Sequence, residues 1–170
     1  LIRDARSKGV ELFLWYSSSG YWNDIEQSPI NIMDNPIARK REMRWLQQQG
    51  VKGIKVDFFG GEPLMAMDTV KRTVEYARSL EQAHNKCFRF TITTNGVLLN
   101  DEIMDFCNRE MSNVVMSLDG RKEVNDYMRP TRNGHGSSYD IIVPKFQKFA
   151  ESRNQDKYYV RGTFTHHNLD

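Results

Sequence analysis

Two carboxylates and two glycines lie close together near the middle of this 170-residue chain. A largely apolar run over 54–59 contains Asp57 and leads directly into Gly60, Gly61 and Glu62. The apolar run predicts a β-strand, and the carboxyl ends of strands in α/β proteins are where ligands and catalytic groups gather. Glycine has no side chain, so a ligand can approach the backbone closely there. The stretch therefore predicts a binding or catalytic site at the end of a strand.

The elements that must position this site alternate along the chain. Apolar runs predict five strands, at 10–16, 53–59, 88–94, 113–118 and 158–165. Apolar residues at helical spacing and helix-capping residues predict helices over 35–49, 64–85, 100–107 and 139–152, after a helix tail at 1–8. The intervening segments 17–35 and 121–137 are predicted as long loops, and Pro144 must fall in the first turn of its helix or bend it.

Alternating strands and helices predict an α/β fold with a parallel sheet. About five β/α units are too few for a closed eight-stranded barrel, so we expect a partial (half) TIM-type barrel or an open, curved sheet. The chain length predicts one domain over 1–170. Unpaired edges of such a sheet, at 10–16 or 158–165, predict a homodimer.

Composition excludes several classes of protein. A net charge of +2 is too small to indicate nucleic-acid or membrane binding. We find no apolar run long enough to cross a membrane and expect a cytoplasmic protein. The two cysteines, Cys87 and Cys107, form no Cys-x-x-Cys pair, so we interpret both as core residues and expect no metal site.

The first third of the chain resembles the catalytic barrel of glycoside hydrolase family 97, which contains α-glucosidases and α-galactosidases. The resemblance is carried by the stretches 9–16, 22–24, 39–42 and 50–58. It implies that Asp57 stands in the place of the catalytic nucleophile. A retaining mechanism needs a second carboxyl group about 5 Å away, and in that family this glutamate comes from regions that have no counterpart here.

The rest of the chain resembles radical S-adenosylmethionine enzymes of the SPASM type, above all the maturases that form thioether crosslinks in SCIFF peptides. The resemblance is carried by the stretches 58–63, 90–96, 113–120, 125–130 and 159–165. It implies that Gly60, Gly61 and Glu62 receive the amino group of S-adenosylmethionine. It also implies that Ser117 and Arg129 contact the ribose and carboxylate ends of that cofactor.

The chain departs from this second resemblance at the loop that binds the cluster, and this departure determines the function that we expect. The family holds a [4Fe–4S] cluster on a Cys-x-x-x-Cys-x-x-Cys loop, and the place of that loop is taken here by the hydrolase-like segment. Cluster ligation requires thiolates. We therefore expect no iron–sulfur cluster and at most weak binding of S-adenosylmethionine.

Two resemblances that meet within 58–61 predict an engineered chimera, with a glycosidase-like segment over 1–59 and a radical-enzyme-like segment over 60–170. Both active sites are incomplete, so we expect no native catalytic function. Two alternatives remain open. One is a radical-enzyme fragment that still binds S-adenosylmethionine weakly. The other is a residual α-glycoside hydrolase that uses Asp57.

Overall fold

The computed structural model describes residues 13–17, 52–132, 134–166 and 168. The helices predicted at 1–8 and 35–49 and nearly all of the loop predicted at 17–35 lie outside the described residues. The described part contains one five-stranded sheet. Its strands are β1 (Phe13–Ser17), β2 (Gly53–Phe58), β3 (Cys87–Thr94), β4 (Met111–Ser117) and β5 (Tyr158–Arg161).

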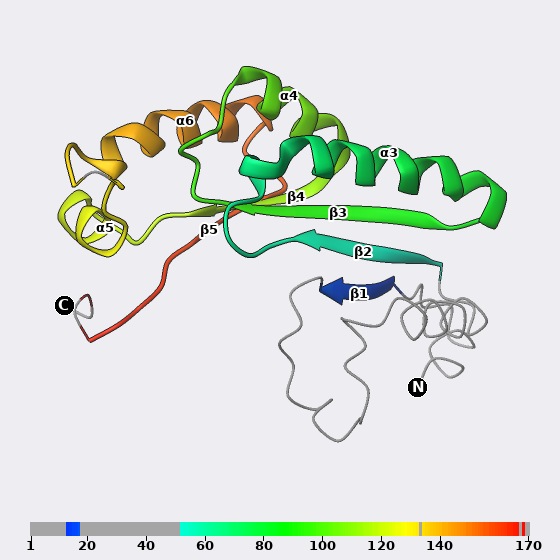
Figure 1. Cartoon of the computed structure of the whole chain (residues 1–170), viewed down its shortest axis with the longest axis horizontal. Coiled ribbons are helices and arrows are strands. Elements are labelled where there is room, and N and C mark those ends of the chain that lie inside the picture. The colour runs from blue at the N-terminus through cyan, green and yellow to red at the C-terminus, as the bar shows by residue number, and fades with distance from the viewer. Residues whose placement is uncertain (1–12, 18–51, 133, 167, 169–170) are drawn as a thin grey trace.

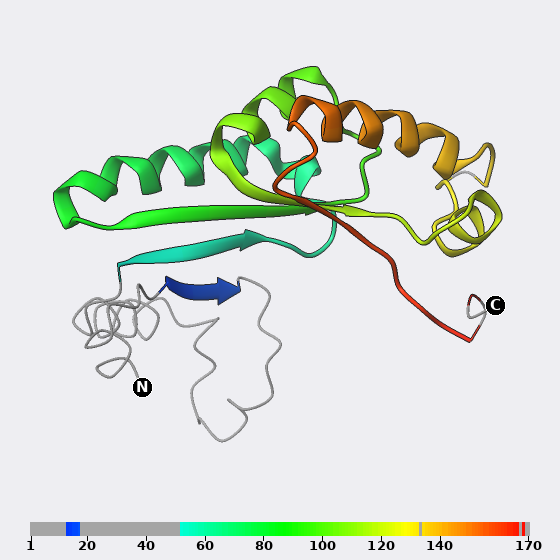
Figure 2. The same cartoon turned by 180° about the vertical axis from the view of Figure 1, so that it is seen from behind.

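The strand order follows the chain, β1-β2-β3-β4-β5, and every neighbouring pair is parallel. Figures 1 and 2 show that helices α3 (Met67–His84), α4 (Asp101–Glu110) and α6 (Ser138–Ser152) cover the same face of the sheet. Crossovers of one hand that always step to the next strand place their helices on one face, as in a barrel. Within the described residues β1 and β5 each pair with a single neighbour, so the sheet is open. The predicted α/β fold with about five parallel strands is confirmed.

Local signals in the sequence explain where the helices begin. The Asn100 side chain accepts a hydrogen bond from the backbone N–H of Ile103 (2.9 Å), as its predicted role as N-cap of α4 requires. Ser137 does the same for α6, accepting from the N–H of Asp140 (3.0 Å). Before α3, a short 3-10 helix η2 (Pro63–Ala66) begins with proline at its first position.

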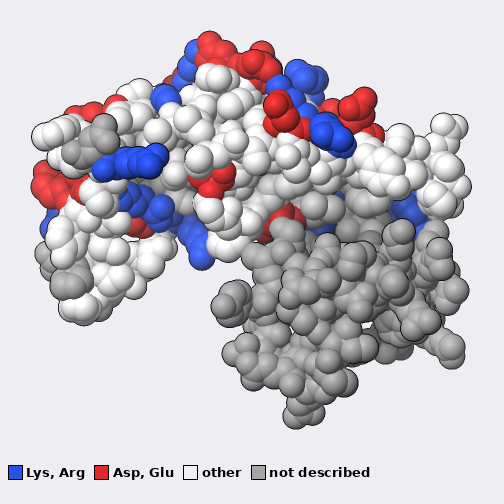
Figure 3. Space-filling model, in the orientation of Figure 1, with Lys and Arg blue, Asp and Glu red and all other residues white. Residues whose placement is uncertain are grey.

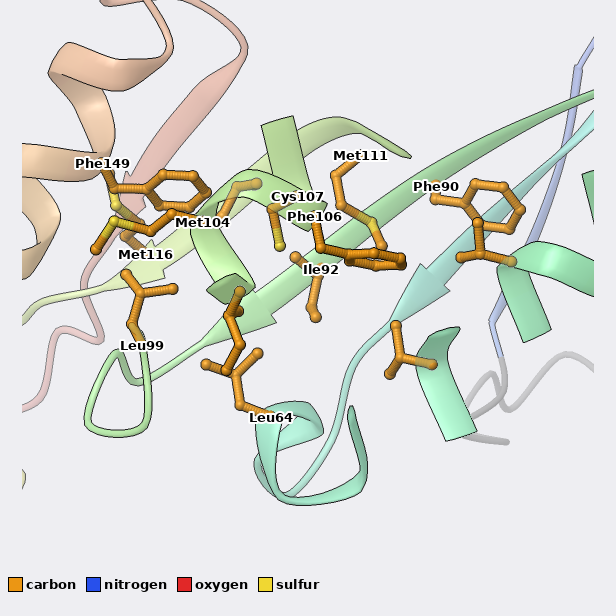
Figure 4. Packing of buried hydrophobic residues seen from close by; sticks show 14 of the residues in the cluster. Leu64, Phe90, Ile92, Leu99, Met104, Phe106, Cys107, Met111, Met116 and Phe149 are labelled. Atoms are coloured by element: carbon orange, nitrogen blue, oxygen red, sulfur yellow. The ribbon is translucent and has the colours of Figure 1, made fainter. Parts of the chain in front are cut away.

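The hydrophobic core lies between the sheet and these three helices (Figure 4). Phe90 and Ile92 from β3, Val114 from β4 and Phe149 from α6 are fully buried. Burying a side chain of this size stabilises the fold by roughly 1.5–3 kcal/mol. Strands β3 and β4 contribute most of the sheet's fully buried side chains. Their carboxyl ends are therefore supported directly by the packed core.

Three boundaries differ from the sequence predictions. A helix, α5 (Lys122–Met128), occupies part of the loop predicted at 121–137. Helix α6 begins at Ser138, which places Pro144 in its second turn rather than its first. Strand β5 ends at Arg161 instead of residue 165. Helix α5 escaped prediction because its fully buried side chain is a polar one, Asn125, so the segment carries no apolar periodicity.

Asn125 is the centre of a buried polar network that joins β4, α5 and α6. Its side-chain oxygen accepts from the N–H of Asp119 (3.2 Å), and its side-chain nitrogen donates to the Ser138 hydroxyl (3.0 Å). Ser138 in turn donates to Asp126 (3.0 Å), which also accepts from the N–H of Tyr139 (2.8 Å). Buried polar groups are stable only when they are paired, so this network fixes the loop after β4 relative to both helices.

The outer surface of the helix layer carries mixed charges. Figure 3 shows acidic and basic side chains interspersed over it. Ion pairs connect neighbouring helices there. Lys71 on α3 pairs with Glu102 on α4 (2.6 Å), and Lys148 on α6 pairs with Asp101 on α4 (2.7 Å). Exposed pairs of this kind contribute little to stability, about 0–1 kcal/mol each. Among the described residues, none of the helices combines the length and the apolar composition needed to cross a membrane.

Replacing Asn125 by alanine should lower the free energy of unfolding by about 1–3 kcal/mol, because the N–H of Asp119 and the hydroxyl of Ser138 lose a buried partner. Urea denaturation of both proteins measures this difference. Asn108→Ala is the matched control, since Asn108 is exposed and its side chain bonds at the surface. The control should stay within about 0.5 kcal/mol of the wild type. Equal effects of the two substitutions would contradict the role given to Asn125.

Burial raises the pKa of the Cys107 thiol to about 12, although the nearby charge of Arg153 acts in the opposite direction. The thiolate is the reactive form, and a pKa this high depopulates it at pH 8. In a Cys87→Ala variant, iodoacetamide should therefore modify Cys107 about a thousandfold more slowly in the native state than in urea. Mass spectrometry of the alkylated protein over time measures both rates. Similar rates in the two states would show that Cys107 is not held in the core.

Candidate functional site

A hollow of about 290 Å³ opens at the carboxyl ends of β2, β3, β4 and β5, where the arrowheads of the strands lie in Figure 1. We call it the strand-end pocket. Its β2 and β3 side is formed by Phe59, Gly60, Gly61, Thr93, Thr94 and Asn95. Its β4 and β5 side is formed by Ser117, Arg129, Arg161 and Thr163. The lining thus combines two cations with hydroxyl, amide and backbone groups.

The two glycines after β2 have backbone conformations that other residues rarely adopt. Gly60 has φ +96° and Gly61 has φ +54°. These angles turn the chain away from the strand and toward η2, and glycine adopts them without steric cost. A Cβ atom built on Gly61 would meet no other atom within 4 Å. The space beside Gly61 is therefore open, and a side chain placed there would occupy it.

Glu62 fastens this turn to the end of β3. Its Oε1 accepts from the N–H of Leu64 (3.1 Å) and from the hydroxyl of Thr94 (2.7 Å), and its Oε2 accepts from the N–H of Asn95 (2.7 Å). Thr94 and Asn95 both line the strand-end pocket. An ionised carboxylate can accept about four hydrogen bonds. Glu62 therefore organises the pocket and keeps acceptor capacity for one further donor.

Arg129 reaches the pocket from the end of α5 and is held by a buried carboxylate. Its Nε donates to Oδ2 of Asp119 (2.7 Å) and its Nη2 donates to Oδ1 (3.1 Å). The side chain of Asp119 is only 2% exposed. Oδ1 also accepts from the N–H of Thr163 beyond β5 (2.7 Å). Paired, bidentate contacts of this kind fix the guanidinium plane, and Nη1 is the nitrogen that this pairing leaves for another acceptor.

Sequence reasoning missed six residues that line this site, Phe59, Thr93, Thr94 and Asn95 beside β2 and β3 and two more beside β5. Arg161 and Thr163 line the pocket from β5 and the segment after it. Arg161 is the register partner of Ser117 across the β4–β5 pair, so the two lie side by side. A signal was present in the sequence, because Tyr159, Arg161 and Thr163 alternate with apolar residues and must share one face of a strand. We nevertheless assigned no site residue to the strand predicted at 158–165.

The structure brings together four of the five residues that the second resemblance assigned to a cofactor. Gly60, Gly61, Ser117 and Arg129 line the strand-end pocket, and Glu62 bonds directly to its wall. Asp57 is different. It lies within β2, paired in register with Ser17 and Thr91, and is not among the residues that line this pocket. The ligand roles of all six residues remain predictions.

The arrangement is suited to binding a polar molecule that carries both signs of charge. Glu62 supplies acceptors at the β3 wall, whereas Arg129 and Arg161 supply donors at the opposite wall. The lining also carries the hydroxyl group of Thr93 on the first side and those of Ser117 and Thr163 on the second. A zwitterion with attached hydroxyl groups would satisfy each of these groups.

Comparison with known protein families gives a match over most of the chain. A family described as "4Fe-4S single cluster domain" matches residues 22–143. That range includes β2 to α5 and most of the strand-end pocket.

Curated relatives include uncharacterized archaeal proteins and several named enzymes. The radical SAM cyclopropyl synthase TigE of Paramaledivibacter caminithermalis is 26% identical over 70% of this chain and 24% of its own length. A serine-type anaerobic sulfatase-maturating enzyme of Bacteroides thetaiotaomicron is 27% identical over 71% of this chain and 29% of its own length. The chain spans less than a third of either relative.

Solved structures agree on the fold. The structure of native anSMEcpe with bound AdoMet and Cp18Cys peptide has a TM-score of 0.56 at 16% identity, covering 87% of this chain and 41% of that one. At this identity the likeness concerns the fold alone. A β-arabinopyranosidase structure shares 60% identity over 52% of this chain and 14% of its own, with a TM-score of 0.34. That TM-score is too low to carry a structural argument for the glycosidase resemblance.

The two cysteines of the chain do not fit a cluster at the pocket. Cluster ligands are thiolates, whereas burial keeps Cys107 in its thiol form within α4. Cys87 begins β3 and so lies at the end of the strand opposite the pocket. Within the described ranges, no three His, Cys, Asp or Glu side chains gather to hold a metal ion. We therefore derive no reaction step through a cluster.

These findings correct two expectations. An engineered chimera without function is contradicted by a family match that runs from residue 22 to 143, across the expected junction at 58–61, and by relatives named as sulfatase-maturating enzymes. The expectation of no iron–sulfur cluster is contradicted by the same family, which is described by its 4Fe–4S cluster. The first expectation rested on two resemblances that meet within 58–61, and the second rested on the missing cysteine loop. The chain belongs to the family of 4Fe–4S single-cluster domains.

Proposed function

We propose that this chain is the S-adenosylmethionine-binding part of a radical enzyme that modifies a peptide or protein. One observation carries the proposal. The strand-end pocket gathers Gly60, Gly61, Ser117 and Arg129 from segments far apart in the sequence, at the end of the sheet where α/β proteins bind ligands.

The relatives support this choice of ligand and reaction class. One of them is named a radical SAM cyclopropyl synthase and another a sulfatase-maturating enzyme. A structure with the same fold contains AdoMet and a peptide. The resemblance of 58–63 and 113–120 to SCIFF-peptide maturases points to the same class, and it extends the proposal to thioether formation in a peptide.

The residues of the pocket suggest how the cofactor would be held. Glu62 would accept from the ammonium group, close to the open backbone of Gly60 and Gly61. The hydroxyl of Ser117 would bond to the ribose. Arg129, fixed by Asp119, would present Nη1 to an oxygen of the ligand. Each contact uses a group that the fold already orients, which lowers the entropy lost on binding.

Three other expectations remain predictions. These are a glycosidase nucleophile at Asp57, a homodimer formed through the sheet edges and a cytoplasmic location. None of them is favoured by a specific feature of the described residues.

S-adenosylhomocysteine should bind the purified protein, and Gly61→Arg should weaken binding by at least about tenfold, because the new side chain fills the open space beside the turn. Isothermal titration calorimetry measures both affinities. Gly134→Arg is the matched control, since Gly134 also has a left-handed backbone (φ +66°) and open space around it but does not line the pocket. The two substitutions impose similar backbone strain, about 1–2 kcal/mol.

Binding that survives in Gly134→Arg and is lost in Gly61→Arg would support the proposal. An absence of heat with the wild-type protein, in a preparation that unfolds cooperatively in urea, would overturn it. Equal affinities in wild type and Gly61→Arg would place the ligand elsewhere and would also contradict it.

A further inference from the structure

The two arginines of the strand-end pocket differ in their electrostatic state. Arg129 forms a two-point ion pair with Asp119, whose side chain is almost completely buried, so its charge is compensated within the protein. Arg161 has no ion-pair partner among the residues that the structure describes. The uncompensated positive charge of this pocket therefore belongs to Arg161.

Arg161 is also held in place, although it lies near the surface. Its guanidinium carbon lies 5.4 Å from the centre of the Phe59 ring, within the range of a cation–π contact. Phe59 directly precedes Gly60, so this contact connects β5 with the glycine turn after β2. Register pairing with Ser117 fixes the backbone of Arg161 beside a second lining residue. Because neighbouring residues hold both the backbone and the guanidinium group of Arg161, its side chain loses little conformational freedom when it binds an anion.

We infer that Arg161 is a specificity-determining residue that binds the carboxylate of the ligand's amino-acid portion. This inference rests on the proposed function and deepens it. Glu62 lies at the β3 wall and Arg161 on β5, so the pocket is polarised from an acidic to a basic end. An α-amino acid group carries the complementary ammonium and carboxylate. Guanidinium is the side-chain group whose flat shape matches a carboxylate with two hydrogen bonds.

The assignment separates the roles of the two arginines. Arg129 acts as a fixed hydrogen-bond donor whose positive charge is balanced by Asp119. Arg161 selects for negative charge on the ligand. The resemblance assigned the ribose and carboxylate ends to Ser117 and Arg129 and gave Arg161 no role. The ion pair with Asp119 is what distinguishes them, and it is visible only in the folded chain.

The test compares two ligands that differ by one group. S-adenosylmethionine and decarboxylated S-adenosylmethionine share the ammonium, ribose and adenine, and the second lacks the carboxylate. Calorimetry should show that the wild type binds the decarboxylated compound about fivefold more weakly. In Arg161→Gln this difference should shrink to less than about twofold, with the loss falling on S-adenosylmethionine alone. In the control Arg109→Gln, an exposed arginine on α4, the wild-type difference should persist.

The outcomes separate this inference from the proposed function. If the wild type binds neither compound, the proposed function fails. If it binds both equally, or if Arg161→Gln keeps the full fivefold difference, the cofactor site stands and the role of Arg161 is overturned. Phe59→Leu provides a second variant that leaves the arginine in place. It should lower the ratio of the two affinities toward that of Arg161→Gln, and an unchanged ratio would contradict the contribution of Phe59 to the position of Arg161.

Discussion

The strand-end pocket depends on one buried carboxylate, that of Asp119. A charge removed from water is tolerated only when it is paired and fully hydrogen-bonded. Asp119 meets this condition with two donors from Arg129 and a third from the backbone of Thr163. Those partners come from the end of α5 and from the chain beyond β5. A single electrostatic requirement therefore sets the positions of three segments around the strand-end pocket.

Much of the fold could be predicted from the sequence because its central elements are apolar and periodic. Strands β2, β3 and β4 and helices α3 and α6 bury apolar side chains at regular spacing, and they lie close to where the pattern placed them. Helix α5 and the roles of Asp119 and Arg161 could not be predicted in the same way. The positions of α5 and Asp119 depend on hydrogen bonds with residues distant in the sequence, such as Ser138 and Thr163. The alternation along 159–163 predicts the face on which Arg161 lies, but not its contact with Phe59.

The cysteines of this chain and its pocket residues give opposite indications about its family. Its two cysteines are placed as structural residues: Cys107 is buried on the core side of α4, and Cys87 lies at the end of β3 opposite the pocket. The pocket residues, in contrast, stand on strand ends that the core supports directly. The family match extends over β2, β3 and β4, at whose ends most of these pocket residues lie. The absence of one loop motif was a poor guide to the whole.

The short length of β5 has a consequence for local stability. This strand has four residues, all but one exposed, whereas β3 has eight residues with four of them buried. Segments with few buried contacts open more often than the core does, without global unfolding. One wall of the pocket therefore stands on β3, which is largely buried in the core, and the opposite wall stands on the more exposed strand β5. A ligand that bridges the two walls would close this local opening, so its affinity and the folding of the last strand are thermodynamically linked.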